Sequence, residues 1–278
     1  MNRKSEIHRL LQLSPAEVRA RAGERLLVCQ DIDGLHQRMA EDIAAEIIAA
    51  ADAGQALNLI LPVGPTGQYV YLVMLINEQN LDLAHCTFFF MDEYCDENGR
   101  ALPPTHPLSF RGIAGGLFLD RLSVPLAESQ VIFPTEDNID VLSGQIVAAG
   151  GIDTCYGGIG IHGHVAFNEP EPGISALACR KVRLNDFTVT INAVRAGVGG
   201  NLAGFPREAY TIGMKEILQS KRIRLYCRNG IGFDWANTVL RLALFGSPGD
   251  DYPVTHIREC DYTIITDEDT LQQPEVIL

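Results

Sequence analysis

The sequence predicts a single α/β domain built on a doubly wound, mostly parallel sheet, with a short helical N-terminal extension. Short apolar runs typical of buried parallel strands alternate with segments of helical periodicity. Strands that alternate with helices imply parallel pairing with right-handed crossovers. The chain has 278 residues, which is enough for one large domain. We assign residues 1–30 to the extension and residues 31–278 to the α/β domain.

The N-terminal half begins with amphipathic helices and continues with alternating strands and helices. The dipeptide Ser14-Pro15 predicts a helix start. Asp33 is the expected N-cap of a long helix, and Gly54 is expected to end it. The expected elements of this half are helices within 1–23, over 34–53 and over Tyr69–Leu81, and strands over Leu57–Val63 and Cys86–Met91.

The C-terminal half resumes the alternation after a loop over residues 95–109. The loop is indicated by Asn98-Gly99 and by three prolines. The expected elements of this half are helices over 109–121, 137–149 and Phe233–Phe245, and strands over Val131–Phe133, Ile152–Ile159, Ala209–Gly213, Ile223–Cys227 and Tyr262–Thr266.

Charge and composition exclude several classes of partner. The net charge is -13, whereas a nucleic acid or an anionic membrane needs a basic surface. The N-terminus lacks the apolar run of a secretory signal, and no stretch reaches the ~18 apolar residues of a membrane helix. Seven cysteines without a CxxC pair favour reduced thiols, and no metal-ligand spacing is present. We therefore expect a cytoplasmic protein without a metal.

Three strand ends carry unusual sequences, and such ends converge at one edge of a doubly wound sheet. The first is the loop Val63–Gln68. Backbone N–H groups of Gly64, Thr66 and Gly67, together with the Thr66 hydroxyl, could hold a phosphate at a helix N-terminus, although glycine and proline also form plain turns. The loop is neither a Walker A motif nor a GxGxxG fingerprint, which argues against ATP and NAD.

The second strand end places Asp92 and Glu93 directly after the apolar run FFFM. Carboxylates at the end of a buried strand are costly unless they are used or paired. A partly desolvated Asp92 would have a raised pKa and could abstract a proton. The alternative is an aspartate that caps the next turn.

The third strand end, Gly157–Pro170, combines glycines, two histidines, an asparagine and a glutamate. His164 and Glu169 are the acid/base candidates, because a carboxylate bonded to one imidazole nitrogen raises the basicity of the other. Asn168 could bind substrate hydroxyl groups. His162 either faces the site or is a core histidine with satisfied hydrogen bonds.

These three segments, in this order and at this spacing, resemble the glucosamine-6-phosphate deaminase family. The matching stretches are LPVGPTGQY, FFFMDEY followed by THPLSF, and GIGIHGHVAFNEP, within a likeness that spans roughly residues 34–246. The ending AFNEP separates this family from the sister 6-phosphogluconolactonases. The resemblance implies a Rossmann-like open sheet and a homo-oligomer. It also implies conversion of glucosamine 6-phosphate to fructose 6-phosphate and ammonia, with no cofactor and no metal.

The resemblance also assigns roles to individual residues. Asp92 corresponds to the base that moves a proton between C1 and C2, His164 to the histidine that opens the sugar ring, and Glu169 to its carboxylate partner. Gly64 and Thr66 fall in the phosphate loop. The other residues expected to bind the sugar phosphate are Gly67, Glu93, Gly163, Asn168, Arg195 and Arg228.

The chain departs from the family pattern at three functional positions. The family has an aspartate where this chain has His162, which we keep among the expected catalytic residues. Pro65 removes one backbone donor from the phosphate loop. The family's phosphate-binding lysine is absent from CRNGIGFDWANTVL, where Arg228 could substitute for it. These changes predict a divergent enzyme with an altered substrate.

Two other functions stay open. One is sugar-phosphate isomerisation without deamination, or hydrolysis of 6-phosphogluconolactone. The other is a sugar-phosphate-binding regulatory protein that has lost catalysis, for which His162 and the missing lysine are the support. Retention of Asp92, His164 and Glu169 argues against a pure binder, because binding needs no base.

Overall fold

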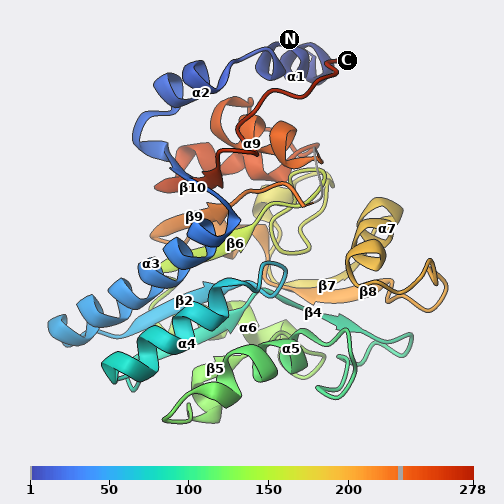
Figure 1. Ribbon diagram of the computed structural model, residues 1–278. Helices are drawn as coiled ribbons and strands as arrows, with labels where there is room; N and C mark the ends of the chain where they lie inside the picture. Colours follow the sequence, from blue (N-terminus) through green and yellow to red (C-terminus); the bar gives the residue numbers. More distant parts are fainter. Residues whose placement is uncertain (1, 231–233) are drawn as a thin grey trace.

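The computed structural model describes residues 2–230 and 234–278, and its centre is a seven-stranded sheet (Figure 1). The spatial order is β1-β10-β9-β6-β2-β3-β5, and every strand pair is parallel. The order reverses between β2 and β6, which confirms the predicted doubly wound, mostly parallel sheet. The strands are β1 (Leu26–Cys29), β2 (Leu57–Leu61), β3 (Cys86–Phe90), β5 (Val131–Ile132), β6 (Thr154–Gly158), β9 (Arg222–Tyr226) and β10 (Tyr262–Asp267).

Helices cover both faces of this sheet. Side chains of α3, α4 and α5 form one apolar cluster with one face, and those of α1, α2, α6, α8 and α9 form a second cluster with the other. None of the described helices combines the length and the apolar character that a bilayer crossing demands. The helices are α1 (Arg3–Leu11), α2 (Pro15–Ala22), α3 (Ile32–Ala53), α4 (Gln68–Gln79), α5 (Phe110–Leu117), α6 (Ile139–Ala148), α7 (Asp186–Arg195), α8 (Met214–Leu218) and α9 (Ala236–Phe245).

The strand β3 shows why the central strands are continuous apolar runs. Phe88 and Phe90 belong to the cluster on the α3–α4 face, whereas Phe89 belongs to the cluster on the α9 face. All three rings are buried. Because helices cover both faces, successive side chains of such a strand are buried in turn.

Helix ends follow local signals, with one difference from prediction. Ser14 caps α2 in a capping box, as its sequence predicted. Asp31, and not Asp33, caps α3, because the Asp31 carboxylate accepts the Gly34 N–H. Gly54 ends α3 in the left-handed conformation, as predicted. The predicted helix over Phe233–Phe245 is observed as α9, although Phe233 itself lies outside the described residues.

A second, antiparallel sheet was not predicted as a unit. It has the order β4-β8-β7. The run Ala209–Gly213 was predicted to be a strand, and it overlaps β8, which pairs in this small sheet and not in the large one. The loop expected over 95–109 follows β4. The strands are β4 (Asp92–Cys95), β7 (Arg180–Arg183) and β8 (Glu208–Thr211).

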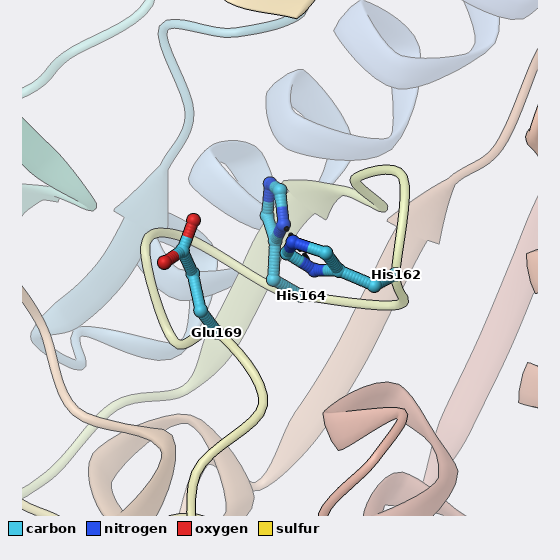
Figure 2. Close-up of side chains that lie close together, drawn as sticks. All are labelled: His162, His164 and Glu169. Carbon is cyan, nitrogen blue, oxygen red and sulfur yellow. Dashed lines mark hydrogen bonds between the residues drawn. The ribbon is translucent and has the colours of Figure 1, made fainter. Parts of the chain in front are cut away.

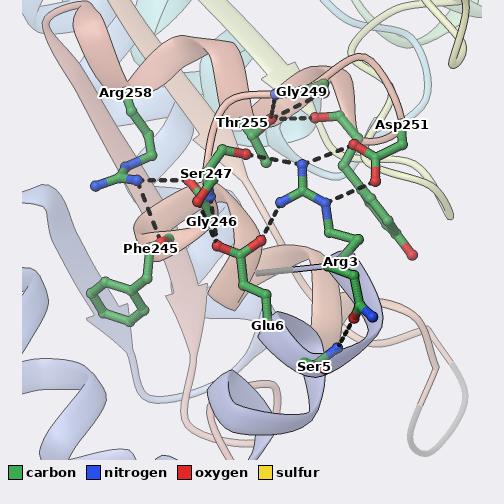
Figure 3. Close-up of polar contacts among 12 residues, drawn as sticks. Arg3, Ser5, Glu6, Phe245, Gly246, Ser247, Gly249, Asp251, Thr255 and Arg258 are labelled. Carbon is green, nitrogen blue, oxygen red and sulfur yellow. Dashed lines mark hydrogen bonds and ion pairs between the residues drawn. The ribbon is translucent and has the colours of Figure 1, made fainter.

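The N-terminal helices lie beside α9 and close to the C-terminus (Figure 1). Arg3 donates to the Asp251 carboxylate and to the Ser247 carbonyl, and Glu6 accepts the Ser247 N–H and hydroxyl (Figure 3). The edge strand β1 lies inside the range 1–30 that the sequence assigned to a helical extension. The helical part of that range therefore ends before Leu26.

Candidate active site

A cavity of about 360 Å³ opens at the carboxyl ends of β2, β3, β6 and β9. Its walls include the loop after β2, the first residue of β4, and the segments that follow β6 and β9. The order of the sheet reverses between β2 and β6, and such a switch point is where open α/β sheets bind ligands. The residues predicted to converge here that line the cavity are Gly64, Thr66, Asp92, His164, Arg195 and Arg228.

Asp92 lies at the start of β4, and its side chain faces the cavity. The residue is only 6% exposed. Its carboxyl forms no hydrogen bond or ion pair with any other residue between 2 and 230 or 234 and 278. Burial raises the pKa of Asp92 well above its usual value, and the neighbouring Glu93 charge raises it further. Asp92 therefore combines the position and the basicity of a proton acceptor.

Glu93 has a different role from the one predicted. Its carboxylate accepts hydrogen bonds from the Ser109 hydroxyl and from the backbone N–H groups of Tyr94, Phe110 and Arg111. Glu93 is 1% exposed and is absent from the cavity walls. These bonds hold the N-terminus of α5 against β4. The prediction that Glu93 binds substrate is corrected: it is an anchor beneath the site.

The loop after β2 presents backbone N–H groups at the N-terminus of α4. Gly64, Thr66, Gly67 and Gln68 donate no backbone hydrogen bond to another described residue. The N-terminal end of a helix carries a partial positive charge, which favours an anion. A Cβ on Gly67 would lie 2.2 Å from the His36 ring, so this position requires glycine. Gly67 itself does not line the cavity.

Arg195 and Arg228 supply positive charge on the same cavity. Arg195 lies over the Trp235 ring at 4.2 Å and is 3.9 Å from Asp234. Burial lowers the pKa of Arg195. The nearby Asp234 carboxylate raises this pKa, and the positive charge of Arg228 lowers it. The pKa of His36 is lowered by burial and next by Arg228. Arg228 is therefore close both to Arg195 and to the start of α4, where an anion would bind.

His162 and His164 form a pair in the turn after β6 (Figure 2). Their Nδ1 atoms are 3.1 Å apart. His162 Nε2 lies 2.7 Å from the side-chain nitrogen of Asn185. A Cβ on Gly160 would lie 1.9 Å from His164 Nε2, so glycine leaves room for the imidazole against the cavity wall. Burial lowers the pKa of both rings, that of His164 to about 3.

Glu169 is not the hydrogen-bond partner of His164 that the sequence predicted. One carboxylate oxygen accepts the Asn185 backbone N–H at 2.8 Å. The other oxygen is buried and has no partner among the described residues. Figure 2 shows the carboxylate beside the two imidazoles, without a hydrogen bond to either. The hydrogen-bond partner of His164 in this chain is therefore His162; His164 lines the cavity, whereas His162 contacts His164 without lining the cavity itself.

Comparison with known proteins gives the relationship directly. No family model matches the chain. The glucosamine-6-phosphate deaminase of Clostridioides difficile is 30% identical over 205 residues, which cover 72% of this chain and 78% of that protein. The chain belongs to the glucosamine-6-phosphate deaminase family. The family's Caenorhabditis elegans deaminase is 28% identical over 207 residues, covering 72% of this chain and 74% of its own.

Solved structures agree with membership in the deaminase family. A monomeric glucosamine-6-phosphate deaminase superposes with a TM-score of 0.75 at 25% identity, over 88% of this chain and 98% of that one. The 6-phosphogluconolactonase of Trypanosoma cruzi gives a TM-score of 0.65 at 16% identity, over 88% and 95% of the two chains. The second likeness shows a shared fold.

Among the described residues, the trio His162, His164 and Glu169 is close enough to suggest a metal site, with ligand atoms within 4.8 Å of one another. The donor chemistry does not fit a metal. The His162 nitrogen that would bind the ion faces His164, and its other nitrogen would then have to carry the proton. That second nitrogen already faces an amide N–H of Asn185. We derive no step through a metal.

Two further residues expected to bind substrate have structural contacts instead. Asn168 is fully buried; its amide donates to the Val165 and Ile212 carbonyls and accepts from Arg180 and the Met214 N–H. The carbonyl of Gly163 accepts a hydrogen bond from Val254. Neither residue lines the cavity. Both hold the turn after β6 in place, and the geometry gives no support to their predicted contact with substrate.

One wall of the cavity consists of residues that were not predicted from the sequence. Tyr94 packs against the rings of Phe110, Phe167 and Phe205, and Asn192 donates to its hydroxyl. All five residues line the cavity. The helix α7 that carries Asn192 was also missed, although Asn185 is a helix N-cap of the preferred type.

Proposed function

We propose that this enzyme moves a proton between neighbouring carbons of an amino sugar phosphate and releases ammonia, with a substrate preference altered by His162. The observation that carries the proposal is the contrast between two adjacent carboxyls. Both carboxylate oxygens of Glu93 accept hydrogen bonds from other parts of the protein. The carboxyl of Asp92 is buried, has no hydrogen-bond partner among the described residues and lines the cavity. An unpartnered buried carboxyl is costly, so its retention favours a catalytic role.

Other groups on the cavity wall favour an anionic group on the substrate. Backbone N–H groups at the start of α4 have no partner among the described residues, and the Thr66 hydroxyl and the two arginines Arg195 and Arg228 line the same cavity. A phosphate would receive charge-assisted hydrogen bonds from these groups. A cavity of about 360 Å³ falls within the range of ~300–1,000 Å³ for small-molecule sites. We infer that these groups hold the phosphate of the sugar while Asp92 acts on its carbon chain.

The raised pKa of Asp92 suits the proposed step. A carboxylate with a raised pKa is a stronger base, and general base catalysis is most effective when the pKa lies near the operating pH. As the pH falls through this raised pKa, Asp92 takes up a proton and kcat/KM should fall with it.

The test is an ammonia assay with glucosamine 6-phosphate and related amino sugar phosphates. The variant Asp92→Asn should lower kcat by ~10²–10⁴-fold while thermal stabilisation by the ligand persists. Asp137→Asn, an exposed aspartate outside the cavity, is the matched control and should keep wild-type turnover. Wild-type turnover in Asp92→Asn would contradict the proposal. Lactone hydrolysis without ammonia release, or ligand binding without turnover, would select the two alternative functions.

The cellular setting stays a prediction. All seven cysteines are free, which supports the proposed cytoplasmic location because reducing compartments keep thiols reduced. The homo-oligomer implied by the resemblance can be tested by light scattering on the purified chain.

A further inference from the structure

A chain of hydrogen bonds determines which nitrogen of His164 carries its proton, and it begins at Asn185. This residue caps α7: its side-chain oxygen accepts the Thr188 N–H at 3.0 Å. This bond fixes the orientation of the Asn185 amide, because a flipped amide would place its NH2 group, a donor, against the Thr188 N–H, which is also a donor. The amide nitrogen of Asn185 therefore faces His162 Nε2, at 2.7 Å.

The tautomer of His162 follows from this contact. An amide nitrogen can only donate, so His162 Nε2 must accept. An imidazolium has no accepting nitrogen, which excludes the charged form of His162 in this arrangement. The neutral His162 ring therefore carries its proton on Nδ1. Burial lowers the pKa of His162, which favours the same neutral form.

The same reasoning extends to His164. The two Nδ1 atoms are 3.1 Å apart, and one proton lies between them. Since His162 Nδ1 carries that proton, His164 Nδ1 accepts it, and the neutral His164 ring carries its own proton on Nε2. His164 Nε2 has no hydrogen-bond partner among the described residues, and it points away from His162 (Figure 2). His164 lines the cavity.

We propose that His162 is a positioning residue that holds His164 as a neutral Nε2–H donor, so that this enzyme acts on the open-chain form of its sugar. This inference rests on the proposed function. A neutral His164 has no accepting nitrogen left to take a proton from a ring hydroxyl, since Nδ1 is occupied and Nε2 is protonated. The aspartate that the family has at position 162 would accept a proton from Nδ1 and leave Nε2 free as a base.

The remaining groups suffice for proton transfer on an open-chain aldehyde. Asp92 breaks the C–H bond next to the carbonyl and keeps the proton. The electron pair forms a carbon–carbon double bond, and the carbonyl oxygen becomes an oxyanion that accepts the His164 Nε2–H. Asp92 returns the proton to the former carbonyl carbon, the oxygen is protonated from water, and water hydrolyses the resulting imine to a ketone and ammonia. A carboxylate base paired with a neutral imidazole donor is an established arrangement for such chemistry.

Nitrogen NMR of the full-length protein with ¹⁵N-labelled histidine tests the tautomer directly, with the His164 signals assigned through His164→Gln. The wild type should show His164 neutral at pH 7, with its proton on Nε2. His162→Asp and His162→Asn form a matched pair of equal size. Asp accepts from Nδ1 and should move the His164 proton there. Asn, whose oxygen faces the Asn185 donor, keeps a donor toward Nδ1 and should preserve the wild-type tautomer.

The wild-type spectrum decides the tautomer even if a variant fails to fold. A proton on His164 Nδ1, or a doubly protonated ring at pH 7, would overturn the proposal.

Kinetics test the substrate form separately. If only the open chain reacts, the wild-type initial rate should stop rising at high enzyme concentration, where uncatalysed ring opening becomes limiting. His162→Asn should show the same plateau, whereas the rate of His162→Asp should stay proportional to enzyme. A wild-type rate that remains proportional throughout would overturn the open-chain assignment. If no amino sugar phosphate is turned over, the proposed function fails, and the NMR result still decides the tautomer.

Discussion

The two sheets of the molecule contribute different things to the site. The large parallel sheet supplies backbone: the strand ends of β2 and β6 place the N–H groups of the loop after β2 and the turn that carries His164. The small antiparallel sheet supplies a reactive side chain, because Asp92 is the first residue of β4. The large sheet thus provides the edge at which we propose that an anion binds, and the small sheet adds the proposed base Asp92.

Asn168 connects these two parts. It lies in the segment after β6 and bonds to Ile212 and Met214, which follow β8. Arg180, the first residue of β7, bonds to the same side chain. The buried amide of Asn168 therefore helps to fix the position of the histidine pair relative to Asp92, together with the hydrogen bond from the Phe167 N–H to the Thr211 hydroxyl.

The largest expected effect in this comparison comes from Asn168→Ala. It leaves donors and acceptors in the segments after β6 and β8, and Arg180 of β7, without these hydrogen bonds, and we expect a loss of ~3 kcal/mol or more in the free energy of unfolding. Turnover should fall as well. Leu59→Ala, in the buried centre of β2, is the matched control, with a similar loss of ~2–5 kcal/mol but unchanged kcat/KM in the folded enzyme. Urea unfolding and steady-state kinetics provide the two readouts. Equal kcat/KM losses in both variants would refute a specific link through Asn168.

A smaller effect is expected at the groups proposed to bind the phosphate. Arg228→Ala removes one charge-assisted contact, worth ~1.5–3 kcal/mol, and should raise KM about 10–100-fold with little change in kcat. Arg224→Ala, on a β9 side chain absent from the cavity walls, is the control. A fall in kcat with constant KM would instead mean that Arg228 acts in the chemical step and not in phosphate binding.

The smallest expected effect is a fall in the free energy of unfolding at acid pH, caused by His164 in the turn after β6. Burial lowers the pKa of His164 to about 3, whereas an unfolded histidine titrates near ~6.5. Below the pKa of the unfolded histidine, the unfolded chain binds a proton that the folded chain excludes. The contribution of His164 to the free energy of unfolding is therefore complete above the unfolded pKa, and it is lost as the pH falls from there to the folded pKa. Between pH ~6.5 and ~4.5 the wild type should lose ~2 kcal/mol more than His164→Gln. Equal losses in urea unfolding would contradict a neutral buried ring.

The large sheet could be predicted from sequence because its signals are local. Runs such as Leu57–Leu61 and Cys86–Phe90 are mostly apolar and short, and Gly54 and Pro62 flank the first of them. The convergence of Thr66, Asp92 and His164 followed from their positions after the carboxyl ends of predicted parallel strands. These features require no knowledge of which distant side chains pair.

The small sheet could not be predicted in the same way. Its strands β4 and β7 read DEYC and RKVR, and charged residues disfavour a strand assignment unless the pairing partner is known. The roles of Glu93 and Asn168 also depend on distant backbone groups. The histidine pair was ambiguous for the same reason, since the tautomer of His162 is determined by Asn185, far along the chain.

The most direct measurement is the exchange of the substrate's C2 proton with solvent deuterium, followed by mass spectrometry of recovered substrate and product. The wild type should introduce deuterium at the carbon next to the carbonyl. Asp92→Asn should bind the same sugar phosphate and introduce almost none. Exchange by Asp92→Asn at the wild-type rate would mean that another group takes the proton, and the assignment of this cavity as a site of proton transfer by Asp92 would fall.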